Sequence, residues 1–210
     1  MADLKQAYSL QSPEDARALY RDWAETYDTG FAEANGYIYP FEVARIAVDH
    51  LDPGSGHVLD VGAGTGLVAI AMQKMSGTDG PEIDGLDISP EMLAIARRQG
   101  CYRKTLVADL TKPLDIPDAS YGGVVSAGTF THGHVGPDAI DELLRITRSG
   151  GVLILGINAE LYESMDFASH LDALKPQIEN LSIVDVPIYD RAALDAPISD
   201  LAKVAVITRN

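Results

Sequence analysis

The chain has 210 residues, of which 46% are hydrophobic and 7% aromatic, enough apolar material for one globular domain with its own core. Its 31 acidic residues outnumber 16 basic ones and give a formal net charge of −15. Such a charge repels nucleic-acid phosphates and anionic membranes at long range, so we expect neither as a partner and favour a small-molecule substrate.

The N-terminal stretch MADLKQAYSL lacks the basic and apolar regions of a signal peptide. No apolar run approaches the roughly 18 residues that span a bilayer. The single cysteine, Cys101, cannot form an internal disulfide, which fits a reducing compartment. These features predict a soluble, cytoplasmic protein and leave its oligomeric state open.

Residues 1–55 are expected to form a short helical lid, because the first 50 residues have the pattern of helix, loop and helix. Pro13 suits the first turn of a helix, where its missing N–H costs nothing. Tyr20, Trp23 and Tyr27 follow at spacings of three and four and form one aromatic face. That face either packs against the sheet as core or covers a site.

Residues 56–157 alternate short β-branched runs with amphipathic helical runs, the pattern of βαβ units. Strands are expected at 57–61, 82–88, 101–108, 121–127 and 151–157. Helices are expected at 66–75, 90–99 and 137–148. Right-handed crossovers then give a doubly wound α/β fold, with helices on both faces of a parallel sheet.

Residues 158–210 differ from this alternation. A helical stretch around 160–174 is followed by two strand-like runs, LSIVDVPIYD and LAKVAVITRN, with a short linker between them. Consecutive strands cannot be parallel neighbours without a long crossover, so this pair is predicted to be antiparallel. All three parts are expected to form a single domain.

The stretch LDVGAGTGL places Asp60 and a glycine-rich turn between the first strand and the first helix. Its glycines, at 62, 64 and 66, allow a tight turn and a close backbone approach to a ligand, next to the free N–H groups of a helix N-terminus. Leu67 stands where the dinucleotide fingerprint has its third glycine, which disfavours NAD and FAD.

Two acids follow at the ends of later strands. Asp87 lies 21 residues after Gly66, where a carboxylate accepts hydrogen bonds from ribose hydroxyls in nicotinamide and adenosine sites alike. Asp109 closes the third strand in LVADL, where an acid near an adenine amino group is typical of an S-adenosylmethionine site. A solvated loop aspartate is the alternative interpretation of Asp109.

Four of these stretches, LDVGAGTG, GLDISPEML, VADL and YGGVVSA, resemble the successive motifs of class I S-adenosylmethionine-dependent methyltransferases, spanning residues 57–157. More narrowly, LYRDWAETYD, DGLDISPEMLAIAR, CYRKTLVADL and GTFTHGHV are similar to the Williams-Beuren syndrome chromosome region methyltransferase-like family. That similarity covers most of the chain up to about residue 157.

The resemblance implies a Rossmann-like, seven-stranded, mostly parallel sheet with an antiparallel last strand. It also implies S-adenosyl-L-methionine as cofactor and S-adenosyl-L-homocysteine as product. The residues that it assigns to the cofactor are a cap of Tyr20, Trp23 and Tyr27, the methionine-flanking Gly62, Gly64 and Gly66, the ribose acid Asp87, the adenine-contacting Ile88, Asp109 and Leu110, and Ser126. One departure is Gly122-Gly123, where the family usually has an aspartate, and we expect local looseness there.

The stretch GTFTHGHVG is expected to begin where the fourth strand ends, among the strand carboxyl ends that form the ligand crevice. His132 and His134 would need a further ligand to hold a metal, so none is expected. They either bond backbone groups and position the helix starting at Pro137, or contact the acceptor. In the second case His132 would accept a proton, and Thr129 would orient the acceptor.

Three functions stay open on the sequence alone. The first is a methyltransferase acting on a small, largely uncharged or cationic molecule at oxygen, nitrogen or carbon, with His132, His134 and Thr129 as catalytic candidates. The second is a non-catalytic cofactor-binding or partner-binding protein. The third is an NAD-dependent enzyme, which the spacing of the glycine turn disfavours.

Overall fold

A seven-stranded sheet forms the centre of the computed structural model, which describes residues 13–131, 135–190 and 201–210. The strands are β1 (Val58–Val61), β2 (Ile83–Asp87), β3 (Thr105–Val107), β4 (Tyr121–Phe130), β5 (Thr147–Asn158), β6 (Ile178–Pro187) and β7 (Leu201–Arg209). They lie in the order β3-β2-β1-β4-β5-β7-β6, and β7 runs antiparallel to both of its neighbours. The predicted doubly wound, mostly parallel sheet with an antiparallel last strand is confirmed.

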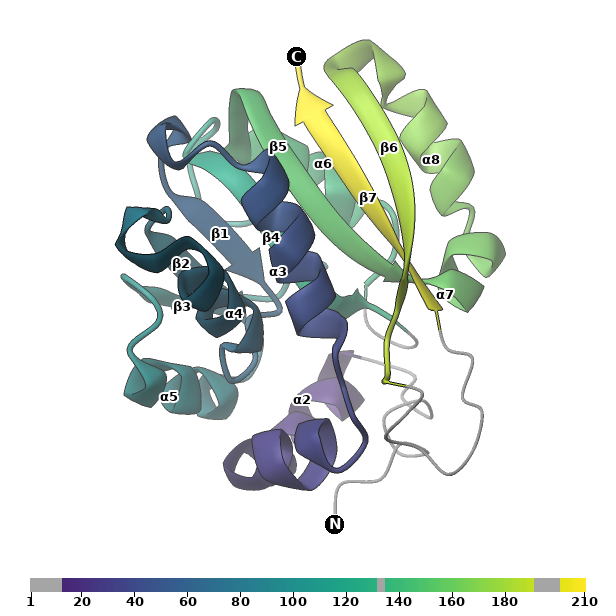
Figure 1. Ribbon diagram of the computed structural model, residues 1–210. Coiled ribbons are helices and arrows are strands. Elements are labelled where there is room, and N and C mark those ends of the chain that lie inside the picture. The colour runs from purple at the N-terminus through teal and green to yellow at the C-terminus, as the bar shows by residue number, and fades with distance from the viewer. Residues whose placement is uncertain (1–12, 132–134, 191–200) are drawn as a thin grey trace.

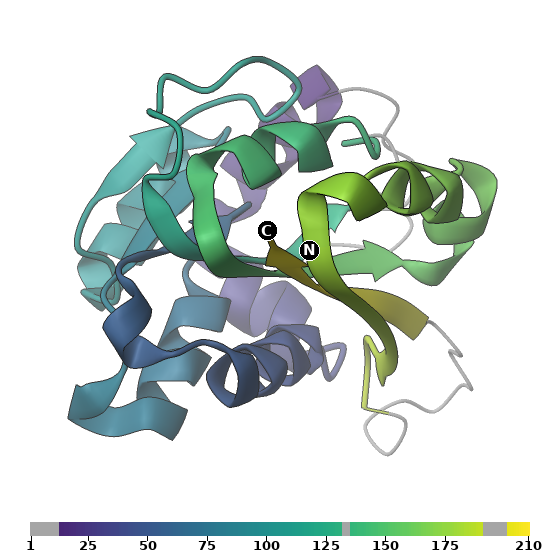
Figure 2. The same ribbon diagram turned by 90° about the horizontal axis from the view of Figure 1, so that it is seen from above.

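Helices cover both faces of this sheet. They are α2 (Pro13–Trp23), α3 (Tyr39–His50), α4 (Leu67–Ser76), α5 (Pro90–Gln99), α6 (Ala139–Ile146), α7 (Ala159–Ser164) and α8 (Phe167–Ala173), with a π-helical segment at Tyr27–Glu33. Figure 2 shows α3 and α4 on one side of the sheet and α6 and α8 on the other. In Figure 1, β7 points upward and α2 lies below the sheet, near the carboxyl ends of the parallel strands. None of the helices in the described part of the chain is long and apolar enough to cross a membrane.

The core consists of two layers because successive strand residues point to opposite faces of the sheet. Val124 of β4 belongs to the layer that contains Ile140 of α6, whereas Val125 belongs to the layer that contains Val43 of α3. All four side chains are fully buried. Helix α3 therefore packs on the sheet, and the chain before it lies over the strand ends.

Several elements differ in extent from those predicted, among them β3, β5 and the helical stretch around 160–174. Strand β3 has three residues instead of 101–108, as suits an edge strand, where short length limits pairing with other chains. Strand β5 begins at Thr147, inside the predicted helix 137–148, because the Thr147 hydroxyl donates to the Leu143 carbonyl at 2.7 Å and the backbone there turns extended. The helical stretch predicted around 160–174 is divided into α7 and α8 at Asp166, whose φ is +55°.

Gly122 and Gly123 were expected to loosen the start of β4, and the structure corrects this. Both glycines are buried, and the Gly122 N–H donates to the His57 carbonyl at 2.8 Å. A Cβ at Gly122 would overlap the Ser55 carbonyl group, and a Cβ at Gly123 would overlap the Leu51 side chain. The missing side chains thus allow close packing of the preceding loop on the sheet.

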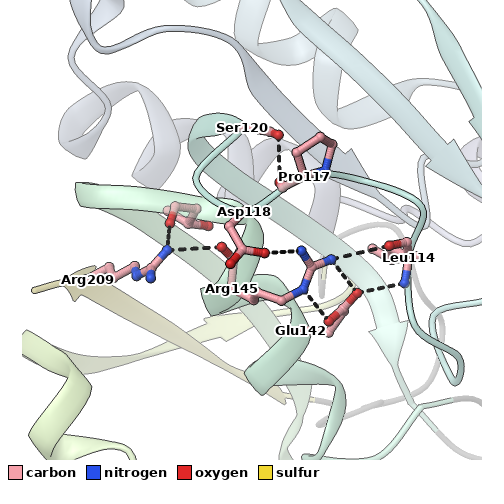
Figure 3. Close-up of polar contacts among 8 residues, drawn as sticks. Leu114, Pro117, Asp118, Ser120, Glu142, Arg145 and Arg209 are labelled. Carbon is pink, nitrogen blue, oxygen red and sulfur yellow. Dashed lines mark hydrogen bonds and ion pairs between the residues drawn. The ribbon is translucent and has the colours of Figure 1, made fainter.

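A charged cluster fixes the loop that joins β3 to β4 (Figure 3). Arg145 of α6 donates to Glu142 at 2.7 and 2.8 Å and pairs with Asp118 in the loop. Glu142 in turn accepts the Leu114 N–H at 2.6 Å, and Arg209 of β7 donates to the Arg145 carbonyl at 3.0 Å. Hydrogen bonds from Arg145 lower the pKa of Glu142, so its carboxylate stays ionised at neutral pH. The cluster ties this loop to α6 and to the C-terminal strand.

We predict that Gly122→Ala destabilises the fold by roughly 1–3 kcal/mol, because the added methyl group overlaps backbone atoms that cannot move independently. Urea unfolding would measure the change. Gly30→Ala is the matched control, since its Cβ would have its nearest neighbour at 3.5 Å, an ordinary contact, within a helical segment. Equal midpoints for the two variants would contradict the close-packing explanation.

Candidate functional site

A cavity opens over the carboxyl ends of the parallel strands. Its walls come from the loops after β1, β2 and β3 and from the ends of β4 and β5. The segment after β6 and the π-helical segment, with the chain on either side of it, complete them. This is the edge at which doubly wound sheets bind ligands, as predicted from the order of elements. The cavity brings together residues that are up to about 170 positions apart, from Tyr20 to Tyr189.

The glycine-rich turn forms one wall. The N–H groups of Gly62 and Ala63 donate to the Leu86 carbonyl at 2.8 and 2.9 Å, which fixes the turn against β2. Gly64 lines the cavity with φ +52°, and a Cβ there would meet a single atom within 4 Å, the Gly62 carbonyl oxygen. A side chain at Gly64 would therefore extend into space that a ligand can use.

Asp87 lies at the centre of this wall. Its carboxylate accepts the Gly64 N–H and the Ser89 N–H, each at 2.8 Å, and so joins the turn after β1 to the start of α5. Burial raises the pKa of Asp87, and the backbone hydrogen bonds from Ser89, Gly64 and Ile88 oppose that rise. Asp87 and Ile88 both line the cavity, where the sequence analysis expected ribose and adenine contacts.

Asp109 and Leu110 line the next stretch of the wall. Within its own loop, Asp109 accepts hydrogen bonds from the Thr111 N–H and hydroxyl at 3.0 and 2.6 Å and pairs with Lys112 at 2.8 Å. Partial burial opposes ionisation, but the hydrogen bonds from Lys112 and Thr111 lower the pKa of Asp109 overall. A negatively charged acceptor therefore lies at the predicted adenine edge.

The aromatic face of the N-terminal segment divides into two parts. Tyr20 and Tyr27 line the cavity. Trp23 does not, because it lies behind them, with 6% of its surface exposed, stacked on Phe31 at 5.6 Å and edge-on to Tyr20 at 6.1 Å. Trp23 can therefore contribute to a cofactor cap by supporting Tyr20 and Phe31, which line the cavity. Phe31 also lines the cavity, although it was not among the predicted cap residues. It lies four residues after Tyr27 and continues the same aromatic spacing.

Three contacts hold this segment to the rest of the domain. The Thr65 hydroxyl, in the glycine-rich turn, donates to the Asp28 carboxylate at 2.6 Å. Arg98 of α5 pairs with Glu25 at 3.0 Å, and Ala24 packs with buried side chains of α5. The Thr65–Asp28 hydrogen bond is the most direct link between the N-terminal segment and the cavity, because Thr65 is itself a lining residue.

Three other predicted residues lie behind the cavity wall. Gly66 begins α4, and a Cβ there would approach the Cys101 sulfur at 2.7 Å. The buried Ser126 hydroxyl donates to the Val61 carbonyl at 2.8 Å. Asp60 is fully buried beneath the turn, where Tyr102 donates to its Oδ2 at 2.6 Å and its Oδ1 has no partner among the described residues. These residues support the turn from below.

The stretch GTFTHGHVG lies partly in a strand, which corrects the expectation that it begins where β4 ends. Strand β4 continues to Phe130, with a bulge between Ser126 and Phe130 that interrupts its register with β5. Thr129 in the bulge lines the cavity, but its hydroxyl donates to the Val61 carbonyl at 2.9 Å. Bulges often redirect side chains beside active sites. His132 and His134 lie outside the described residues.

Comparisons with known proteins agree with this geometry. A family model described as a methyltransferase domain matches residues 59–155. Human methyltransferase-like protein 27 is 31% identical over 161 residues, covering 73% of this chain and 62% of that protein. Demethylmenaquinone methyltransferase of Thermus thermophilus is 34% identical over 116 residues, covering 53% and 51%. The solved TehB-like SAM-dependent methyltransferase of Corynebacterium glutamicum has a TM-score of 0.60 at 20% identity, over 92% of this chain and 99% of that one, which shows a common fold.

This chain spans 62% and 51% of the length of the two curated relatives. Residues 59–155 are thus similar to a methyltransferase domain, and the chain shares its fold with a solved SAM-dependent methyltransferase.

We predict that Asp60 makes the fold less stable as the pH rises. Burial raises the pKa of Asp60 to about 7, the Tyr102 hydrogen bond opposes the rise, and Asp87 adds repulsion. Between about pH 4 and pH 7 the folded chain keeps a proton that the unfolded chain has lost, so the free energy of unfolding falls across that window. Urea unfolding at pH 4.5 and pH 7.5 should show that Asp60→Asn gains stability relative to the wild type at the higher pH. An identical pH dependence for both proteins would exclude this role.

We also predict that Thr65→Val loosens the N-terminal segment, because valine keeps the shape of threonine but cannot donate to Asp28. Trp23 is the single tryptophan of the chain, so acrylamide quenching of its fluorescence reports on that segment. Quenching should increase in Thr65→Val and stay at the wild-type level in Thr208→Val, a matched change on β7. Unchanged quenching in Thr65→Val would show that the hydrogen bond does not hold the segment.

Proposed function

We propose that this chain, whose residues 59–155 match a methyltransferase domain, binds S-adenosylmethionine and transfers a methyl group from that donor to a small-molecule acceptor. The observation that carries the proposal is the Asp87 carboxylate, held by two backbone N–H groups at 2.8 Å beside a turn whose Gly64 leaves room for a ligand. This is the arrangement that a ribose with two hydroxyl groups would use.

The residues of the cavity fit such a donor. The turn at 62–64 would flank its methionine part, Asp87 its ribose, and Ile88 with Asp109 and Leu110 its adenine. Burial raises the pKa of the Tyr20 phenol, and the charge of the nearby Asp87 raises it further, which supports a place for Tyr20 over the ribose. Gly66, Ser126 and Trp23 would act from behind these contacts.

When bound, the cofactor supplies a methyl group on a positively charged sulfur, so that a bond from acceptor to carbon forms as the carbon–sulfur bond breaks and sulfur keeps the electron pair. The chain's main task is then to align donor and acceptor and to exclude water. A base is required if the acceptor must lose a proton, and His132 stays our candidate for that role, with His134 and Thr129 as neighbours. The Thr129 hydroxyl already donates its proton to the Val61 carbonyl. Toward the methylated substrate, its oxygen could therefore only accept a hydrogen bond.

The alternatives are weaker for specific reasons. NAD would require the glycine that Leu67 replaces, and Leu67 lines the cavity with an apolar side chain. A non-catalytic cofactor-binding protein would share every donor contact, so activity alone separates it from an enzyme. The narrower assignment to the Williams-Beuren syndrome chromosome region methyltransferase-like family stays a proposal from the sequence motifs. A cytoplasmic location and the absence of nucleic-acid partners stay predictions from composition and charge.

We predict that S-adenosylhomocysteine binds with micromolar or tighter affinity and that Asp87→Ala weakens it about ten- to a hundredfold, or roughly 1.5–3 kcal/mol, as expected for a charged hydrogen-bond acceptor. Isothermal titration calorimetry would measure both affinities. Asp49→Ala, an exposed acid on α3, is the control for the loss of one negative charge. Well-folded wild type without detectable binding would refute the donor site.

Catalysis itself is tested by incubating the protein with methyl-labelled S-adenosylmethionine and a metabolite extract, followed by separation of labelled products. A labelled small molecule that disappears with Asp87→Ala would support the proposed function. Donor binding without a labelled product, across extracts that cover the common metabolite classes, would favour the non-catalytic alternative.

A further inference from the structure

The cavity has a second half that the donor contacts do not use. The donor residues come from the ends of β1, β2 and β3, on one side of the sheet. The opposite half lies over β4 and β5. Its lining includes Gly128 and Thr129 of β4, Asn158 at the end of β5, and the aromatic residues around Tyr37 and Tyr189. An acceptor must therefore meet the methyl group from this side.

Two distant segments build the wall of this half. Tyr37 forms an isolated antiparallel bridge with Tyr189, and their rings lie 5.7 Å apart. The N–H groups of Ile38 and Tyr39 donate to the Ile188 carbonyl at 3.1 and 3.2 Å. The ring centroids of Tyr37 and Tyr39 lie 6.2 Å apart, in an edge-to-face arrangement. The wall of Tyr37, Tyr39 and Tyr189 is thus held by backbone hydrogen bonds and is preorganised for a ligand.

The charge of the lining excludes one class of acceptor. Among the described lining residues none is a lysine, arginine or histidine, and the charged ones are Asp87 and Asp109, both in the donor half. Burial raises the pKa values of the Tyr37 and Tyr39 phenols well above their usual value, so both hydroxyl groups stay neutral. A carboxylate or phosphate placed there would lose its hydration without gaining a counter-charge from any described lining residue, at a cost of several kcal/mol.

The polar groups of the wall suit a neutral ligand. The Tyr39 hydroxyl has no hydrogen-bond partner among the described residues, but it is buried against Gly156 of β5, where a Cβ would overlap it, so it adds no charge to the wall. A Cβ at Gly128 would lie 3.0 Å from the Tyr37 hydroxyl, so the lack of a side chain there leaves that hydroxyl its place beside the strand end. Aromatic rings favour stacked or edge-to-face contact with another aromatic ring, beyond the gain from simple burial.

We propose that the wall of Tyr37, Tyr39 and Tyr189 selects an uncharged aromatic acceptor, a flat ring system that carries a neutral hydroxyl or amine as the methylated group. The proposal rests on the proposed methyl transfer, because it assigns the acceptor half of the same cavity. A cationic ring-bearing amine is the competing occupant, since tyrosine faces also attract cations.

The test uses wild-type protein saturated with S-adenosylhomocysteine, so that the donor half is filled. Calorimetry then compares 2-naphthol with three matched probes, namely the anion 2-naphthoate, the saturated 2-decalol and the cation of 2-naphthylmethylamine. We expect 2-naphthol to bind at least about tenfold tighter than each of them, because each lacks either neutrality or the aromatic ring. Equal or tighter binding of any of the three, or no binding of 2-naphthol at millimolar concentration, would overturn the proposal.

A pair of variants locates the binding. Tyr189→Leu keeps apolar bulk but removes the ring, and it should weaken 2-naphthol about fivefold or more while the affinity for S-adenosylhomocysteine changes less than about twofold. Tyr162→Leu is the control, because Tyr162 stacks on Phe167 of α8 outside the cavity, and both affinities should stay at the wild-type level. Equal weakening of 2-naphthol by both variants would contradict the assignment of the wall.

The first measurement also distinguishes failure of the proposed function from failure of the proposed acceptor class. If S-adenosylhomocysteine does not bind to folded wild type, the proposed function fails. If it binds and the naphthol series shows no preference for the neutral aromatic probe, only the acceptor class fails.

Discussion

The site depends on how one carboxylate is held. Asp87 ends β2, and each of its two oxygens accepts a backbone N–H at 2.8 Å, one from the turn after β1 and one from the start of α5. Two loops that a ligand must contact at the same time are therefore fixed by a single side chain. Because those N–H groups offset part of the cost of burial, the carboxylate can remain at the cavity surface and still accept further hydrogen bonds.

The sequence was most informative where the local pattern and the tertiary constraint agree. The helix predicted at 90–99 has those bounds in the structure, because Ser89 accepts the Met92 N–H and Pro90 occupies its first turn. The glycine turn and Asp87 could be placed because βαβ order alone puts strand ends at one edge. The antiparallel pairing of β6 and β7 followed in the same way from the short connection between them.

Other features depend on contacts that no local pattern contains. The sequence at Gly122 predicts a loosely packed start of β4. In the structure, the Ser55 carbonyl occupies the space that a side chain at Gly122 would need. The continuation of β4 through Thr129 requires a bulge that is set by pairing with β5. Tyr37 and Tyr189 were absent from the predicted site because they are 152 positions apart and meet through an isolated bridge.

The two halves of the cavity come from different segments of the chain, and this separation has a consequence for how the protein can change. Every donor contact proposed between Gly62 and Leu110 lies inside the matched region 59–155, whereas Tyr37, Tyr39 and Tyr189 lie outside it. The bridge that joins those outer segments involves neither the glycine turn nor Asp87. Substitutions can therefore change the proposed acceptor wall and leave the proposed donor contacts from Gly62 to Leu110 in place. Related enzymes with one inherited donor site could in this way diverge in what they methylate, through exchange of two short peripheral stretches.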